Sequence, residues 1–273
     1  MFEIYDLNMN KLSFPDGVVP LEIFVGSISK ERITESVEGR SGVIDYGFNY
    51  KDRPVDLFFR IKAKDEIDFR LLRSEIYNFF DVGVYFYVAE SAVPSRVLKV
   101  VVDDTYLPDR LTVEYADFDV TCRTLDSVFW ESKYTTLELH DSGYAHSAEK
   151  YGLVDNIDDE KIKYRFTENN FTVYNAGNVT VEPESMLLHI FVTSATGDSI
   201  TIKNNTTGES FTLNRKMNAR HIQVNGMIVT DGTTQVFRDT NKRFISLAPG
   251  DNSITVTDAT FNEIRFSFKY YYK

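Results

Sequence analysis

Residues 55–80, VDLFFRIKAKDEIDFRLLRSEIYNFF, decide the fold class of the first half of the chain. Val55, Leu57, Phe59 and Ile61 stand at every second position, and the side chains of a β-strand point alternately to its two faces. These four apolar side chains therefore share one face. The pattern predicts a strand that turns this face toward a core.

The second part of the stretch predicts an amphipathic helix. Apolar residues recur there at intervals of three to five, as on one stripe of a helix. Asp65 is the expected N-cap, with Asp68 reaching back in capping-box fashion, and Glu66 and Arg70 form a weak outer pair. The stripe should hold the helix against the core, and it is expected to consist of Ile67, Leu71, Leu72, Ile76, Phe79 and Phe80.

Strand patterns flank the helix on both sides. They are expected at residues 2–7, 21–25, 84–88, 97–102, 111–115 and 118–122. Strands, one helix and more strands predict an α+β domain, which we place at residues 1–132. Its boundary with the next domain is expected between about residues 131 and 161.

Residues 133–273 carry the pattern of an all-β domain. Residues 135–140 are a possible strand, and later short strands are separated by clusters of Gly, Asn, Asp and Pro. Asn225-Gly226 is a strong signal for a two-residue hairpin, and residues 249–252 form another turn. Short strands at this spacing predict a β-sandwich.

Composition and charge exclude several classes of protein. Hydrophobic residues make up 42% and charged residues 26% of the 273 residues, as in ordinary globular chains. The net charge of −11 divides into −9 for residues 1–140 and −2 for the rest, so no basic stripe is available to bind nucleic acid. The first residues do not resemble a signal peptide and no apolar run is long enough to span a membrane, so we expect synthesis in a cytoplasm and no membrane partner.

The residue types that carry catalysis or bind metals form no recognisable motif. The sequence has no nucleophile elbow, phosphate-binding glycine loop, zinc-protease motif or calcium loop. His140 and His146, with Asp141 between them, are the nearest approach to a metal site, but their spacing matches no regular ligand pattern. Cys122 is the single cysteine and lacks a nearby histidine. We therefore predict no enzyme activity, no cofactor and no metal.

Short motifs appear in a characteristic order along nearly the whole chain. The first half contains Phe14-Pro15-Asp16-Gly17, Gly39-Arg40-x-Gly42, Tyr46-Gly47-Phe48-Asn49-Tyr50, Leu72-Arg73-x-Glu75-Ile76 and Val128-Phe129-Trp130-Glu131-Ser132. The second half contains Tyr174-Asn175-Ala176-Gly177-Asn178, Glu182-Pro183 and Leu247-Ala248-Pro249-Gly250-Asp251-Asn252-Ser253-Ile254. In this order the motifs resemble those of the distal tail protein family of siphophages, the bacteriophages with long non-contractile tails.

The resemblance implies a structural role. It implies an N-terminal α+β domain followed by a galectin-like or carbohydrate-module-like sandwich, in a homo-hexameric ring at the distal end of the virion tail. The implied partners are the major tail tube protein, the tail-associated lysin or hub protein and, as further candidates, receptor-binding proteins. DNA would pass through the ring as cargo only, and the protein would be made in the host cytoplasm.

A carbohydrate- or receptor-binding module of a tail fibre or baseplate is the alternative. Lectin sandwiches often bind sugars on tryptophan and tyrosine platforms, but Trp130 precedes the sandwich. In the run Tyr270-Tyr271-Tyr272, alternation leaves at most two rings on one face.

A polar stretch at residues 27–50 is the candidate for contact between subunits in such a ring. It is rich in Gly, Ser, Glu and Arg and is hard to pack into an isolated core. It is either an arm that reaches the next subunit or a hairpin that folds back on its own domain. Tyrosine and arginine dominate interface hot spots. The candidate interface residues are Arg40, Tyr46, Phe48, Tyr50 and Arg53.

Overall fold

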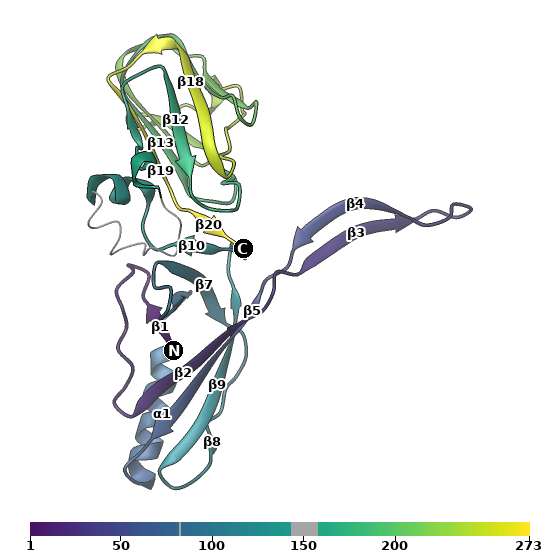
Figure 1. The fold of residues 1–273 in the computed structure, drawn as a ribbon, viewed down its shortest axis with the longest axis vertical. Helices are drawn as coiled ribbons and strands as arrows, with labels where there is room; N and C mark the ends of the chain where they lie inside the picture. The colour runs from purple at the N-terminus through teal and green to yellow at the C-terminus, as the bar shows by residue number, and fades with distance from the viewer. Residues whose placement is uncertain (82, 143–157) are drawn as a thin grey trace. The chain divides into compact units, whose positions relative to one another are not determined.

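The structure is a computed structural model that describes residues 1–81, 83–142 and 158–273. The chain divides into two compact units, Met1–Trp130 and Glu131–Lys273. Both units consist mainly of β-strands (Figure 1). Within the described ranges, no helix combines the length and the apolar character that a membrane span requires.

The first unit is a β-sheet with one helix packed against it. Its strands follow the order β1-β6-β7-β9-β5-β2, and β8 pairs with β9. The helix contributes three buried side chains to the core of this sheet. The elements are β1 (Phe2–Tyr5), β2 (Val18–Val25), β3 (Lys30–Ser36), β4 (Val43–Tyr50), β5 (Pro54–Lys62), α1 (Glu66–Phe80), β6 (Phe86–Glu90), β7 (Arg96–Val102), β8 (Asp109–Arg110) and β9 (Tyr115–Thr124).

Strand β5 lies at the centre of this core, as its alternation predicts. Its four apolar residues at positions 55, 57, 59 and 61 are all fully buried. Phe59 stacks on Phe118 of β9 with ring centroids 4.9 Å apart, and it meets Phe2 edge-on at 5.1 Å. Strand β9 presents the matching alternation, so two adjacent strands line the core with every second residue.

The predicted cap of α1 is confirmed, but part of the predicted stripe is wrong. The Asp65 carboxylate accepts a hydrogen bond from the backbone N–H of Asp68 at 2.8 Å. Ile67 and Leu71 are 72% and 59% exposed, whereas Phe69 is buried with Leu72 and Ile76. At about 100° per residue, Ile67 and Leu71 fall on the side of the helix opposite Phe69. The spacing of the apolar residues is compatible with either of two helix faces. The face that contains Phe69 packs against the core, and the face that contains Ile67 and Leu71 is exposed.

The buried thiol of Cys122 gives a first testable prediction. Burial raises the pKa of Cys122 to about 12, because the charged thiolate would be removed from water. Since the thiolate is the reactive form, a thiol reagent at pH 8 should label the folded protein at least about 100-fold more slowly than the unfolded protein. Labelling in buffer and in urea, followed by mass spectrometry, measures the ratio. Equal rates in the two conditions would contradict the buried placement.

The second unit contains the remaining strands. Its last strand lies beside residues 131–132, where the N–H of Ser132 donates to the carbonyl of Tyr270 at 2.8 Å. The elements are β10 (Trp130–Ser132, which begins at the end of the first unit), η2 (Asp159–Lys161), β11 (Arg165–Phe166), β12 (Asn170–Asn175), β13 (Leu188–Asn204), β14 (Ser210–Leu213), β15 (Met217–Asn225), β16 (Ile228–Asp231), β17 (Thr234–Gln235), η3 (Phe237–Asp239), β18 (Gly250–Thr260), β19 (Glu263–Phe268) and β20 (Tyr271–Tyr272).

The long strand β13 connects two groups of strands in this unit. Its first half pairs with β15 and β19, and its second half pairs with β14 and β18. The register shifts between Val192 and Gly197, where a Cβ on Gly197 would lie 2.5 Å from the carbonyl oxygen of Asp258. Glycine permits this close backbone approach. The unit is mostly β-sheet, and the galectin-like detail of the fold stays a prediction.

In the second unit the hairpin after Asn225 is confirmed, but the turn expected at residues 249–252 is wrong, because residues 250–252 lie in β18 and pair with β12. Asn225 of β15 pairs with Ile228 of β16, so the two turn residues are Gly226, with φ +55°, and Met227, one position later than the Asn225-Gly226 signal. At residues 249–252, the fully buried Asn252 accepts from the N–H of Ala248 at 2.9 Å and donates to its carbonyl at 2.8 Å. The buried amide thus fastens the first residues of β18 to Ala248, just before the strand.

The possible strand at residues 135–140 is wrong, because residues 136–142 are helical. Thr135 caps this helix. Its Oγ1 accepts from the N–H of Glu138 at 3.4 Å, and the Glu138 carboxylate accepts from the N–H of Thr135 at 2.7 Å. This reciprocal pair is a capping box, and its Thr-x-x-Glu signature is present in the sequence. The two adjacent threonines, which favour strands, concealed it.

Candidate functional site

Residues 30–50, within the polar stretch at residues 27–50, form a β-hairpin arm that projects from the first unit (Figure 1). Among the described strands, β3 and β4 pair only with each other, and all seven residues of β3 are exposed. We use the word arm for β3, β4 and their connecting tip at residues 37–42. Since the arm has no core of its own, its side chains are presented to the surroundings along its whole length.

Exposed polar contacts join the two strands of the arm. Arg32 donates to the Asp45 carboxylate at 2.6 Å, and the Tyr46 hydroxyl donates to Glu35 at 2.8 Å. The N–H of Gly47, followed by Arg32, holds the pKa of Asp45 below its usual value, and the bond to Glu35 raises the pKa of Tyr46. Pairs so exposed to water stabilise a fold only weakly, and an isolated two-stranded hairpin is marginally stable. A partner that covers the arm would add the burial that it lacks.

A β-bulge in β4 divides the side chains of the arm. Arg32 pairs with Phe48, but Thr34 pairs with Asp45, so one residue of β3 opposes the two residues 46–47 of β4. One extra residue moves all the side chains beyond it to the other face of the ribbon. The bulge therefore separates the tip half of β4 from the half nearer the domain.

The arm consequently has two different aromatic faces. On one face, Phe48 and Tyr50 meet edge-on at 5.3 Å, and the Lys30 ammonium lies 4.2 Å from the Phe48 ring. Tyr46 lies on the other face, where it contacts Glu35. Period-two spacing alone would place all three rings together, whereas the bulge lets the arm contact a partner from two sides.

Gly47 makes this bulge possible and gives a second prediction. Its φ is +109°, a value that side chains with a Cβ rarely adopt, and a Cβ at this position would meet no other atom within 4 Å. Gly47→Ala should therefore strain only the arm. We expect a thermal midpoint within about 2 °C of the parent and assembly weakened by about tenfold or more. Calorimetry and mass photometry measure the two effects. Gly208→Ala in the second unit, where φ is +79° and a Cβ would also meet no atom within 4 Å, is the matched control and should leave assembly unchanged.

Arg40 lies at the tip of the arm. Its backbone N–H donates to the carbonyl of Val37 at 3.1 Å, and its side chain is exposed. Gly39 and Gly42 on either side have φ of +81° and +87°, which the tight reversal requires. Arg40 thus lies in the tip that connects β3 and β4, at the end of the arm away from its base.

Arg53 has a different position, because its side chain is turned into the first unit and is 7% exposed. Its guanidinium donates to the carbonyl of Gly26 at 2.8 Å and to that of Val128 at 3.1 Å. The Tyr50 ring also meets Phe129 edge-on at 5.2 Å. These contacts fasten the base of the arm, so Arg53 supports the arm instead of extending its surface.

Three exposed aliphatic residues add to the arm surface beyond the candidates from the sequence. Ile33, Val37 and Val43 are 47%, 45% and 63% exposed. They lie in β3, in the tip and at the start of β4. In the sequence these three residues are separated by polar residues. They show no strand or helix periodicity that would identify them as surface contacts. Together with the exposed aromatic residues they give the arm apolar surface that a partner can cover.

No chemical site emerges from the described part of the chain. It contains no group of three or more His, Cys, Asp or Glu residues able to hold a metal ion. The ring nitrogen Nδ1 of His140 lies 3.3 Å from the carbonyl of Ile162, and His146 falls outside the described residues. Tyr270, Tyr271 and Tyr272 are at most 4% exposed, so they offer no platform for a sugar ring.

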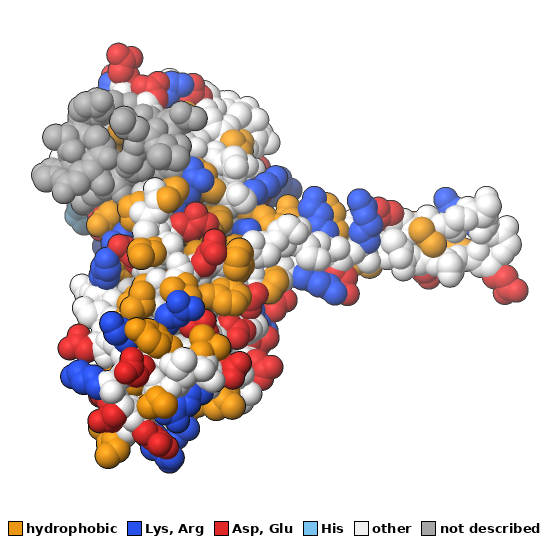
Figure 2. Space-filling model, turned by 60° about the horizontal axis from the view of Figure 1, so that its bottom comes forward, with side chains coloured by type: hydrophobic (Ala, Val, Ile, Leu, Met, Phe, Trp, Pro, Cys, Tyr) orange, Lys and Arg blue, Asp and Glu red, His pale blue; other side chains and the backbone are white. Residues whose placement is uncertain are grey.

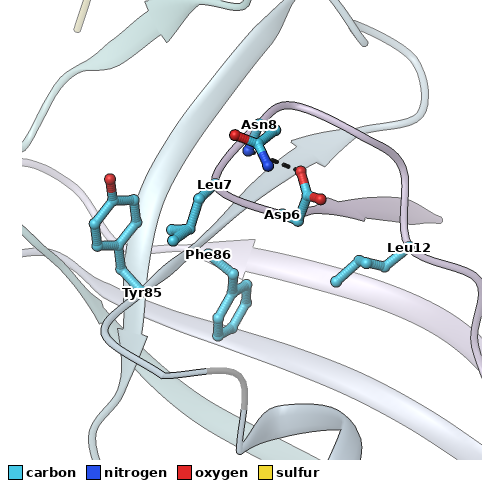
Figure 3. Close-up of a pocket in the computed structure, with 6 residues that line it drawn as sticks. All are labelled: Asp6, Leu7, Asn8, Leu12, Tyr85 and Phe86. Carbon is cyan, nitrogen blue, oxygen red and sulfur yellow. Dashed lines mark hydrogen bonds between the residues drawn. The ribbon is translucent and has the colours of Figure 1, made fainter.

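A small hollow in the first unit also lacks binding chemistry (Figure 3). Its one carboxylate, Asp6, accepts from the backbone N–H groups of Asn8 and Asn10, both at 2.8 Å. The hydrogen bond from the Asn10 side chain contributes most to lowering the pKa of Asp6. The carboxylate of Asp6 therefore already accepts hydrogen bonds from residues of its own loop. The hollow is lined by Asp6, Leu7, Asn8, Leu12, Tyr85 and Phe86.

Charges of both signs are distributed over the face of the first unit in Figure 2 and along the arm. The whole first unit contains 23 acidic and 15 basic residues, a net charge of −8. Positive and negative side chains alternate along the arm itself, as the Arg32–Asp45 and Lys51–Glu31 pairs illustrate. The visible face therefore has no extended basic surface.

Residues 15–122, which contain the arm and most of the first unit, match the family model of the phage tail protein RIFT-related domain. Over these residues the first unit is similar to a phage tail protein domain. The resemblance to a siphophage tail protein, predicted from the motifs, is thereby confirmed for these residues.

A solved structure shares the fold over nearly the whole chain. The Dit (gp 19.1) protein of phage SPP1, described as a paradigm of hub adsorption apparatus in phages that infect Gram-positive bacteria, has a TM-score of 0.67 at 12% identity, with 99% of each chain covered. Chains of the activated phage p2 baseplate, determined with Sr and with Ca, have TM-scores of 0.47 at 8% and 7% identity, with 98% of this chain and 97% of those chains covered. No curated protein matches the sequence.

Proposed function

We propose that this protein is a structural component of a siphophage tail tip, a distal tail protein that closes into a hexameric ring. The ring joins the tail tube protein on one side to the hub or lysin protein on the other during adsorption to the host. The observation that carries this proposal is the arm. A hairpin that pairs with no other strand in the described part of its chain, within a segment similar to a phage tail domain, is suited to contact another subunit.

Ring closure explains why the arm differs from the rest of the unit. In a cyclic ring each subunit uses one patch to contact a different patch on its neighbour. An arm that leaves its own core supplies the first patch, and its two aromatic faces bury against the second. Aromatic and arginine side chains at the centre of such contacts contribute most of the binding energy. The proposed contact residues on the arm are Arg40, Tyr46, Phe48 and Tyr50, with Arg53 holding its base.

The acidity of the first unit suits a channel for DNA. Its net charge of −8 would repel the phosphate backbone and discourage adhesion to the wall during passage. The role is assembly, without catalysis or a cofactor. The alternative, a carbohydrate-binding module, loses its aromatic platform because Tyr271 and Tyr272 are buried.

Mass photometry of the full chain tests the proposal, alone and with the tail tube and hub proteins of the same phage. A dominant species of six subunits, alone or after addition of a partner, is the expected result. A chain that remains monomeric in every mixture would refute the ring.

A further inference from the structure

A second exposed surface lies on the second unit, far in the sequence from the arm. It is an apolar hollow at the sheet edge formed by β16 and β17. Met227 and Ile228, at the tip of the β15–β16 hairpin, are 49% and 52% exposed. Phe237 of η3 is 36% exposed, and the buried Val229 lies beneath them. The lining residues are Met227, Ile228, Val229, Gln235 and Phe237.

Hydrogen bonds and ring stacking fix the residues that line the hollow. Val236 donates its N–H to the carbonyl of Val229 at 2.9 Å, which brings η3 against β16. The Phe237 ring stacks on Phe244, and Phe244 stacks on the buried Phe211. Phe237 is therefore fixed on one side and open on the other. Methionine and phenylalanine are enriched in protein interfaces, so the lining suits an apolar side chain of a partner.

Positive charge gathers next to this hollow, in contrast to the acidity of the chain. Residues 214–243 contain six Lys or Arg residues and two Asp residues, a net charge of +4 within a protein of −11. Arg215 engages both carboxylates, at 3.3 Å for Asp231 and 2.9 Å for Asp239, and Arg220 lies 3.9 Å from Asp231. Among the described residues, the other exposed cations Lys216, Arg238, Lys242 and Arg243 have no ion-pair partner.

These cations belong to two adjoining loops beside the hollow. The N–H of Asn214 donates to the carbonyl of Asp239 at 2.8 Å, and Leu213 bridges to Thr240. The loop with Lys216 thus lies against the segment from Arg238 to Arg243. Arg238 directly follows Phe237 of the hollow. An apolar recess and a basic rim are therefore parts of one surface, which we call the basic rim hollow.

We propose that the basic rim hollow binds an acidic peptide segment of another protein, with an apolar side chain seated in the hollow and carboxylates on the rim. Unpaired cations around an apolar centre favour a partner with the complementary arrangement, since interfacial charges select partners and orient them. This inference does not depend on the ring, because it concerns a different unit and a different partner surface.

A phosphate polymer fits this surface less well than a peptide does. Phosphates would engage the cations, but a polyanionic backbone would leave Met227, Ile228 and Phe237 exposed to water. A peptide with aromatic or aliphatic side chains between Asp and Glu residues would satisfy both parts. Burial of the apolar residues would then contribute in addition to the charge contacts.

Selection from a random dodecapeptide display library on the immobilised full chain tests this proposal. We expect the enriched peptides to carry net negative charge and at least one large apolar residue. Arg238→Glu with Lys242→Glu should weaken a selected peptide by about tenfold or more, and Ile228→Thr should weaken it by about fivefold. Lys203→Glu, an exposed cation on β13 of the same unit, is the matched control and should leave binding unchanged.

Several outcomes would overturn the proposal. These are an absence of enrichment, enrichment without acidic bias, or binding that the paired charge reversal leaves unchanged. Oligo-dT of matched length is the competitor for a phosphate-polymer site. If it displaced the peptide at equal concentration and Ile228→Thr had no effect, the surface would be a phosphate site instead. Circular dichroism of each variant checks that the second unit remains folded.

Discussion

Replacement of residues 31–49 by a two-residue Asn-Gly turn should abolish assembly and leave the first unit folded. Lys30 and Tyr50 are paired across the base of the arm, so a short hairpin turn can connect them without moving the rest of the sheet. The removed residues bury no core, and the thermal midpoint should remain within about 2 °C of the parent. Mass photometry should then show monomers where the parent forms rings, a loss of about 100-fold or more in assembly affinity.

A variant away from the arm provides the control for this deletion. Ile67→Ser changes an exposed apolar residue on α1 in the same unit, and ring formation should persist. Rings that survive removal of the arm would show that other surfaces hold the subunits together. A large fall in the thermal midpoint would show instead that the arm is part of the folded core.

Phe59→Ala should cause the largest loss of stability among single substitutions in the first unit. Phe59 is fully buried and its ring contacts Phe2, Phe14, Phe80 and Phe118 at centroid distances of 5.1, 5.5, 5.5 and 4.9 Å. Removing this ring leaves a cavity that rigid neighbours cannot fill, with an expected loss of about 3–5 kcal/mol in the free energy of unfolding. Urea denaturation followed by tyrosine fluorescence measures this loss.

A matched control lies on the neighbouring strand of the same sheet. Phe24 is 53% exposed and makes an edge-on contact with Phe58 at 5.3 Å. Phe24→Ala should cost less than about 1 kcal/mol, as is usual for exposed positions. Similar losses for the two variants would contradict the position of the core around β5. The transition of the second unit should be unaffected in both, so two separate transitions are expected.

Sequence patterns predicted correctly those elements that are determined by residues close together in the chain. The alternation of β5, the Asp65 cap of α1 and the hairpin after Asn225 depend on residues close in sequence, and all three are confirmed. The face of α1 was harder to predict, because Ile67 and Leu71 mimic a buried stripe. Phe69 is buried because it packs against residues that are distant in the sequence, and the periodicity of the helix contains no information about such contacts.

The position of the arm could be predicted from its polar composition, but its geometry could not. Nothing in the spacing of Tyr46, Phe48 and Tyr50 reveals that the bulge at Gly47 moves Tyr46 to the opposite face. Arg53 resembled an interface residue by type, and its burial follows from carbonyl groups distant in sequence. The basic rim hollow likewise requires loops that only the folded sheet brings together.

Photo-crosslinking from the arm tests the central claim most directly. A benzoyl-phenylalanine replaces Tyr46 in full-length protein, and equal amounts of light-isotope and ¹⁵N-labelled chains are mixed before irradiation. We predict crosslinked peptides that combine both isotopes, joined to residues 1–130 of another copy, and a ladder that ends at the hexamer. Crosslinks confined to single chains, or no crosslinks from an assembled ring, would contradict the arm as the contact between subunits.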